Sequence, residues 1–175
     1  MSMFPIASAT LASDGTIQFN NLPTTFTHLQ LRVNAVAPSG STTGTYTSAI
    51  GLGDGGGYWT AGYDHMLYGD GATVTASYQT TGANLGYGYG VNGGTNIRST
   101  FILDILDYAN TNKYKTLRCL NGYDINGGGR VGLYSMLYPN LGIPTFLTFN
   151  FGGIQAGAGT TAQLYGIQSS TATGA

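Results

Sequence analysis

The chain has 175 residues, a formal net charge of −1 and a charged fraction of only 7%. So weak a charge supplies no basic field for phosphates, which argues against nucleic-acid binding, and the lack of glutamate argues against long helices and coiled coils. A hydrophobic fraction of 42% can still build a core, and the length fits one domain.

Residues 1–16 are predicted to be an N-terminal arm. Met3, Phe4 and Ile6 are apolar and lack a turn-rich cover, so we expect the arm to pack on a neighbouring subunit or on a larger shell, as an added strand or an extended arm. The arm has no basic start and Pro5 interrupts its apolar run, so no signal peptide is expected. No stretch reaches about 18 consecutive apolar residues, so no membrane span is expected.

The clearest strand pattern lies at 27–35, where apolar and polar residues alternate strictly. Alternation with a period of two is typical of a half-buried strand. Residues 77–94 are rich in Gly, Tyr and Asn, and they are predicted to form a long exposed loop or an irregular strand pair. Further strands are predicted, in chain order, at 16–20, 46–52, 63–68, 99–106, 113–120, 130–138, 143–151 and 161–168.

These patterns indicate eight or nine strands separated by turn residues, and no helix. Such spacing predicts an all-β fold, an antiparallel β-sandwich that is jelly-roll-like. The sequence shows no linker that would divide it, so residues 17–168 are predicted to form one sandwich domain. Residues 169–175 are small and polar and are predicted to be a flexible tail.

Glycine-rich motifs are interpreted as loops. Two segments match the G-x-G-x-x-G pattern, at 51–56 and 88–93, but a dinucleotide site needs a helix directly after the glycines and neither segment has one. Asp54, Asp70 and Asp124 lie among glycines, which favours turns, with a calcium ion held by their oxygens as the alternative. No cofactor and no metal site is predicted.

No catalytic centre is predicted. His28 lies on the polar side of its strand and His65 lies in a short strand. Cys119 has no evident base nearby in the sequence. Asp104 and Asp107 are three residues apart, which on a strand places them on opposite faces. The chain is therefore interpreted as a protein that is not an enzyme.

The aromatic residues are the main candidates for a binding surface. Tyrosine and tryptophan are enriched at protein interfaces, so a contact surface is predicted. Two other interpretations stay open: tyrosine is also good strand material, and exposed aromatics beside Asn and Asp can stack on sugar rings. The predicted interface residues are Met3, Phe4, Ile6, Tyr58, Trp59, Tyr63, Tyr87 and Tyr89.

Five segments together carry a recognisable pattern. They are THLQLRVNA (27–35), LYGDG (67–71), ILDILDYANTNKYKTLRCLNGYD (102–124), GLYS (132–135) and AQLYGI (162–167). These segments resemble a group of small, β-rich structural proteins of tailed-bacteriophage virions. The resemblance runs over most of the chain from 17 to 168 and is least at 39–62 and 72–97.

The resemblance implies a non-enzymatic virion component that is made in the host bacterial cytoplasm. A single domain of this size suits a capsid-decorating or cement protein, and such proteins are commonly symmetric oligomers, often homotrimers. The expected partners are other copies of the chain and the major capsid protein or other virion proteins. The alternative is a tail- or fibre-associated module that binds a receptor or host glycan through Tyr58, Trp59, Tyr63 and loop aspartates.

Overall fold

A computed structural model describes residues 2–59, 63–69, 73–79, 84–90, 97–152 and 154–168. Within these ranges the chain is all-β, and no helix is long and apolar enough to cross a membrane. The strands are β1 (Ser2–Thr10), β2 (Ile17–Asn20), β3 (His28–Val36), β4 (Gly44–Asp54), β5 (Gly57–Tyr58), β6 (Tyr63–Gly69), β7 (Val74–Gln79), β8 (Asn84–Gly90), β9 (Arg98–Leu106), β10 (Lys115–Asp124), β11 (Gly129–Tyr138), β12 (Phe146–Phe151) and β13 (Thr161–Gln168).

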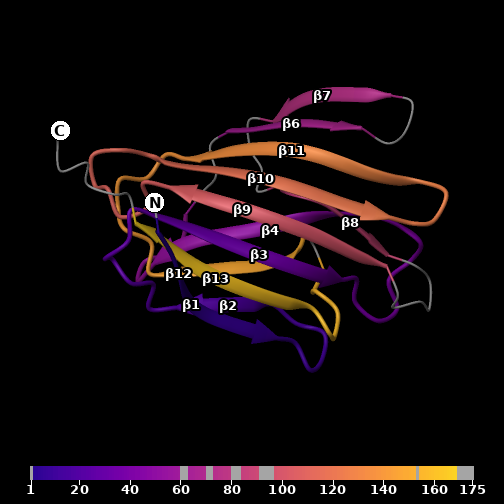
Figure 1. The fold of residues 1–175 in the computed structure, drawn as a ribbon, viewed down its shortest axis with the longest axis horizontal. Coiled ribbons are helices and arrows are strands. Elements are labelled where there is room, and N and C mark those ends of the chain that lie inside the picture. Colours follow the sequence, from indigo (N-terminus) through magenta and orange to yellow (C-terminus); the bar gives the residue numbers. More distant parts are fainter. Residues whose placement is uncertain are drawn as a thin grey trace.

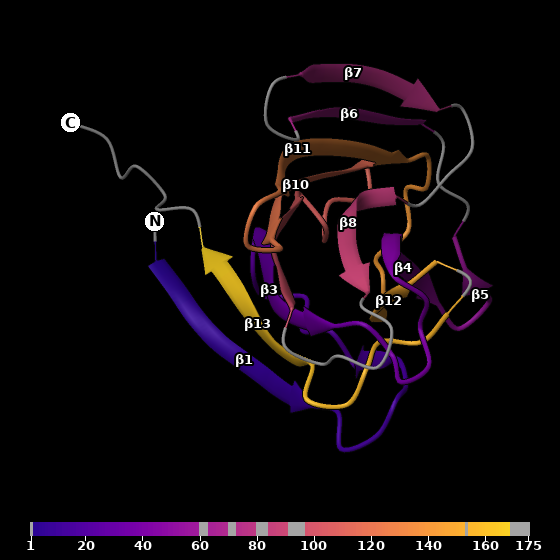
Figure 2. The same cartoon turned by 90° about the vertical axis from the view of Figure 1, so that its right-hand side faces the viewer.

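Two antiparallel sheets pack together as a sandwich, which confirms the predicted fold class (Figure 1). The larger sheet has the order β1-β13-β3-β9-β10-β11-β6-β7. The smaller sheet has the order β2-β12-β4-β5, and β8 also pairs with β4. Figure 2 shows the smaller sheet against one side of the larger one, with β8 lying inside the curve of β10 and β11.

Eight of the strands have the pairing of a jelly roll. Strand β1 pairs with β13, β2 with β12, β3 with β9, and β4 with β8, so outer strands enclose inner ones in a nested series. The segments between β4 and β8 and between β9 and β12 add β5, β6, β7, β10 and β11. Four of these additions, β6, β7, β10 and β11, widen the larger sheet. Strands β6, β10 and β11 coincide with predicted strands, so the strands beyond those predicted are β1, β5, β7 and β8.

The predicted arm is instead an edge strand of this chain's own sheet. Residues 2–10 form β1, which pairs with β13 from Ser2 opposite Gln168 to Thr10 opposite Thr161. The sandwich therefore begins at Ser2 and not at residue 17. Pro5 lacks an N–H group, and it lies at a break in the register, as proline in an edge strand commonly does. The predicted tail at 169–175 lies outside the described residues.

Part of the 77–94 segment, predicted as a loop or an irregular strand pair, is strand β8, and its glycines allow it to pack closely. A Cβ atom on Gly88 would lie 2.2 Å from the Phe151 ring. Gly86 has a φ of +136°, which disfavours other residues, and a Cβ there would lie 2.7 Å from Asn121. The buried Asn121 side chain accepts the Tyr87 N–H and donates to the Thr100 carbonyl, so it joins β8 to the larger sheet.

The core lies between the sheets and includes polar groups that are paired across it. The Phe149 ring packs edge-on against Phe101 of the opposite sheet, with ring centroids 5.1 Å apart. The buried Tyr138 hydroxyl donates to the Ile50 carbonyl at 2.6 Å, which joins β11 to β4. Burial raises the pKa of Tyr138 to about 12, because the phenolate cannot be solvated there.

We expect Tyr138→Phe to lower the free energy of unfolding by about 1–2 kcal/mol, because it leaves the buried Ile50 carbonyl without this donor. Urea unfolding measures the change. Tyr114→Phe is the matched control, since the Tyr114 side chain is half exposed and should tolerate the loss of its hydroxyl. Equal stability of the two variants would contradict the proposed role of the Tyr138 hydroxyl.

One carboxylate joins three loops at an end of the sandwich. The Asp14 side chain accepts hydrogen bonds from the Ser39 hydroxyl and N–H and from the Ala158 N–H. These bonds lower the pKa of Asp14 below its ordinary value of 3.8, and the bond from the Ser39 side chain has the largest effect. A lowered folded-state pKa stabilises the fold above the unfolded pKa, and this stabilisation is lost as the pH falls through the folded value.

We therefore expect Asp14→Ala to reduce the free energy of unfolding by about 1–2 kcal/mol at neutral pH. The difference from the unsubstituted chain should shrink as the pH falls below the ordinary value of 3.8 and through the lowered folded-state pKa, because the carboxyl then becomes protonated in both states. Urea unfolding at a series of pH values measures it. A difference that stays constant throughout the acid range would show that the ionised carboxylate is not the stabilising form.

Candidate interaction surface

The outer face of the larger sheet carries exposed aliphatic side chains. In β9, alternation turns Phe101, Leu103 and Ile105 into the core, and it turns Ile102 outward to solvent. Strands β10, β11 and β6 alternate in the same way, so each presents its own outward set. Because the smaller sheet covers only the inner face, this outer face is open.

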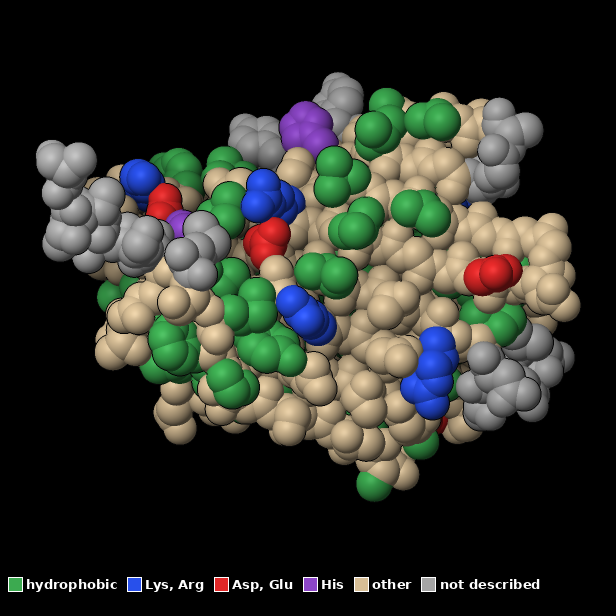
Figure 3. All heavy atoms as spheres, viewed as in Figure 1, with side chains coloured by type: hydrophobic (Ala, Val, Ile, Leu, Met, Phe, Trp, Pro, Cys, Tyr) green, Lys and Arg blue, Asp and Glu red, His purple; other side chains and the backbone are tan. Residues whose placement is uncertain are grey.

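Four of the outward residues line up across neighbouring strands and form what we call the apolar row. Ile102 lies opposite Leu120, Leu120 opposite Leu133, and Leu133 opposite Leu67. Their exposed fractions are 40%, 51%, 54% and 49% in that order, and Ala76 of β7 continues the line. Figure 3 shows hydrophobic side chains running across this face. A contiguous exposed patch of this kind typically marks an interaction surface.

A second row, which we call the polar row, runs parallel to the apolar row. On each shared strand its residue is two positions away from the residue of the apolar row. Gln30, Asp104, Arg118, Ser135 and His65 lie opposite one another in that order on β3, β9, β10, β11 and β6. The Gln30 amide donates to Asp104 at 2.8 Å, and Arg118 pairs with Asp104 at 3.2 Å. The charges of this row are thus nearly balanced within the chain.

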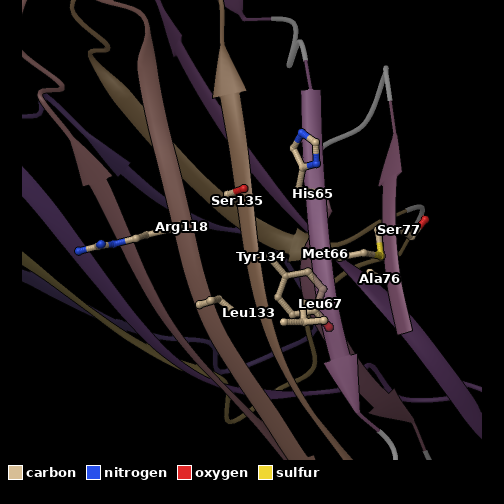
Figure 4. A pocket seen from close by; sticks show the side chains of 9 residues that line it. All are labelled: His65, Met66, Leu67, Ala76, Ser77, Arg118, Leu133, Tyr134 and Ser135. Atoms are coloured by element: carbon tan, nitrogen blue, oxygen red, sulfur yellow. The ribbon is translucent and has the colours of Figure 1, made fainter. Parts of the chain in front are cut away.

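A shallow hollow of about 480 Å³ opens on this face beside the apolar row. Its walls come from β6, β7, β10 and β11, as Figure 4 shows, and the Arg118 side chain extends away from the other lining residues. Leu67, Leu133 and Ala76 make it mainly apolar, while His65 and Ser135 add polar groups. The hollow has room for an aliphatic side chain of another molecule.

The predicted interface residues of β1 lie elsewhere, at one edge of the larger sheet. Met3 and Phe4 are 44% and 42% exposed, and Ile6 is half-buried. The Phe4 ring lies 5.8 Å from that of Phe26, which gives it one aromatic neighbour in its own chain. The Met3 sulfur lies 3.7 Å from the Arg32 guanidinium, which follows Ile102 on the outer face, so Met3 borders that face while Phe4 turns towards Phe26.

Tyr58 and Trp59 lie at the edge of the smaller sheet, and Figure 2 shows β5 and β1 on opposite sides of the molecule. Tyr58 is 65% exposed and packs edge-on against Phe146. Trp59 is half-buried against the core, and its backbone N–H donates to the Leu52 carbonyl. Tyr63 belongs to β6, but its side chain lies outside the described residues.

Tyr87 and Tyr89 are half-buried between the sheets, a position that favours the structural interpretation of these two residues. The Arg130 guanidinium lies 4.5 Å from the Tyr87 ring centre and 4.3 Å from that of Tyr68, which places it between two aromatic faces. Tyr89 packs on Tyr123 with ring centroids 5.4 Å apart. The predicted residues thus fall into three separate groups.

The candidate catalytic residues have structural partners. His28 Nδ1 accepts the Asp107 N–H at 2.9 Å, which ties β3 to the turn after β9. Cys119 is buried, and burial raises its pKa to about 12, so the thiolate is suppressed. Asp104 is paired with Arg118. These contacts assign His28, Cys119 and Asp104 to packing and to the outer face.

The predicted turn chemistry at the aspartates is confirmed where it is described. Asp54 accepts the Gly56 N–H and Asp124 accepts the Asn126 N–H, which is the arrangement of an Asx turn. In the described ranges, no group of three or more His, Cys, Asp or Glu side chains comes together as metal ligands would. Asp70 lies outside those ranges.

Comparisons of the chain with protein-family models, with curated proteins and with solved structures gave no match. The fold class is therefore defined by the strand pairing alone, as a jelly-roll sandwich with a widened sheet. Because one fold hosts many functions, the function has to be argued from the surface.

If the apolar row faces solvent, its residues should contribute little to folding. We expect Leu133→Thr to change the free energy of unfolding by less than about 0.5 kcal/mol in dilute solution. Leu117→Ala, on the inward side of β10, should cost about 2–5 kcal/mol because it leaves a cavity. Urea unfolding of both variants tests this, and a large loss for Leu133→Thr would mean that the row is covered within the chain.

Proposed function

We propose that this chain is a non-enzymatic structural protein of a tailed-phage particle, which decorates the capsid and stabilises it through subunit contacts. The observation that carries the proposal is the apolar row on the open face of the larger sheet. These four aligned aliphatic side chains are exposed and do not belong to the core of their own chain. The row offers a flat, rigid surface to another protein.

The placement of the phage-like segments supports the proposal. The segments at 27–35, 67–71, 102–124, 132–135 and 162–167 fall on β3, β6, β9, β10, β11 and β13, apart from the connection 107–114 and short flanking residues. These six strands are neighbours in the larger sheet, in the order β13-β3-β9-β10-β11-β6. The resemblance is therefore concentrated on the sheet whose outer face carries the apolar row.

The composition suits a surface that is buried in an assembly. Removing a charge from water costs several kcal/mol unless it is paired, whereas small uncharged side chains are desolvated at much lower cost. Only 7% of the residues are charged, and Asp104 and Arg118 on the outer face are already paired with each other. Close packing of many copies therefore brings little repulsion.

The proposal is tested with virions purified from a lysate of the phage that encodes the chain. We expect quantitative mass spectrometry to find the protein at hundreds of copies per particle, the number that a lattice of capsid sites requires. Its absence from the particles would reject the proposal. A yield of only a few copies per particle would reject capsid decoration in favour of a place on the tail.

A further inference from the structure

We propose that the outer face of the larger sheet binds a second copy of this chain, about a two-fold axis that runs along the boundary between β10 and β11. The inference rests on the proposed structural function, because it names the partner of the same face. It follows from the order of side chains in three parallel rows, each of which fits its own copy under this rotation.

The apolar row is symmetric about this boundary. Two of its residues, Ile102 and Leu120, lie on β9 and β10, and the other two, Leu133 and Leu67, lie on β11 and β6. A two-fold rotation about an axis along this boundary places Leu120 over Leu133 of the second copy, and Ile102 over its Leu67. Every aliphatic side chain of the row then meets another one, and each contact occurs twice, as in an isologous interface.

The polar row stays compatible in charge under the same rotation. Arg118 comes to lie over Ser135 of the second copy, and Asp104 over His65. Beyond Ile102, the apolar row is continued on β3 by Arg32, which comes to lie over Ala76 of the second copy. None of these pairs brings two charges of the same sign together, and Asp104 faces the imidazole that can carry the opposite charge.

The third row adds a match of size. It lies on the other side of the apolar row, where Gly122 of β10 pairs with Val131 of β11, and Thr100 pairs with Gly122. Val131 is 64% exposed and projects outward beside a glycine. The rotation places Val131 over Gly122 of the second copy, where no side chain stands, and it places Thr100 over Gly69. Across these four strands, large residues therefore meet small ones, and on the next strands outward Asn34 lies over Val74.

Neighbouring axes do not fit. An axis between β9 and β10 would place Arg32 over Leu133, and Gln163 over Leu67, which buries a guanidinium and an amide on two leucines of the apolar row. The β10–β11 axis places Arg32 over Ala76 instead, one strand farther from the axis. An axis between β11 and β6 would leave Ile102 with no strand opposite it. Among these three axes, only the β10–β11 boundary pairs all four residues of the apolar row.

The hollow on this face also receives a side chain in the proposed pair. It is lined by Leu67, Ala76 and Leu133, and the strands of the second copy that lie over it are β9 and β3. Ile102 of the second copy is the outward aliphatic residue at that point. Two twisted sheets pack face to face with their strands nearly aligned, and this rotation satisfies that condition.

Sedimentation velocity and light scattering of the purified full chain test the pairing. We expect a concentration-dependent mass that rises to twice the 18.2 kDa of one chain. Leu120→Lys and Leu133→Asp should each weaken the pair about 30-fold or more, because each places an unpaired charge at its centre. Circular dichroism and thermal melting should show both variants folded, since both positions face solvent in the single chain.

A mixture of variants tests the axis itself. When Leu120→Lys and Leu133→Asp are mixed, the new lysine faces the new aspartate across the two-fold axis, so dimers should return as a mixed pair. The matched control mixes Leu120→Lys with Leu67→Asp, whose aspartate faces Ile102 and not the lysine. This control mixture should stay monomeric, and rescue by it to the same extent would overturn the proposed axis.

A wild-type chain that stays monomeric, or an oligomer whose mass is unchanged by Leu120→Lys, would overturn the pairing. A trimer that persists in this variant would do the same. None of these results bears on the number of copies in virions, so the pairing can fail while the proposed function stands. Absence from virions, in turn, leaves the mass measurement on the purified chain unaffected.

Discussion

The structure depends on one constraint: in a β-strand, neighbouring side chains point to opposite faces, and the strand pairing aligns them into rows. The core row of the larger sheet includes Leu31, Leu103 and Cys119, which are nearly inaccessible to solvent. Once their burial sets the register, the positions of the intervening outward-facing residues are also fixed. The outer rows are a direct consequence of core packing.

The sandwich is joined by a few polar contacts as well as by its core. Tyr138 connects β11 to β4, and Asn121 connects β10 and β9 to β8. In this way the inserted strands β10 and β11 are bound to the jelly roll that they extend. The extension widens the larger sheet, and without it the apolar row would stop after Ile102 on β9.

Much of the fold follows from local patterns. The strand predicted at 27–35 is β3, found at His28–Val36, because its alternation matches one buried and one open face. The arm was misplaced because nothing in residues 1–16 shows that β13 offers them a free edge. For 77–94 the sequence leaves a loop and an irregular strand pair open, because the glycines that allow β8 to pack against Phe151 look like turn glycines; β8 is a strand, but its partner is β4.

By itself, the sequence determined the class of fold and the low charge, because these depend on composition and on short-range periodicity. The apolar runs such as that around Ile102 even signal a strand with aliphatic residues on both faces. Only the tertiary structure decided that Ile102, Leu120, Leu133 and Leu67 form one row. Residues far apart in the chain are aligned by the register of four strands, and register is a property of pairing between segments.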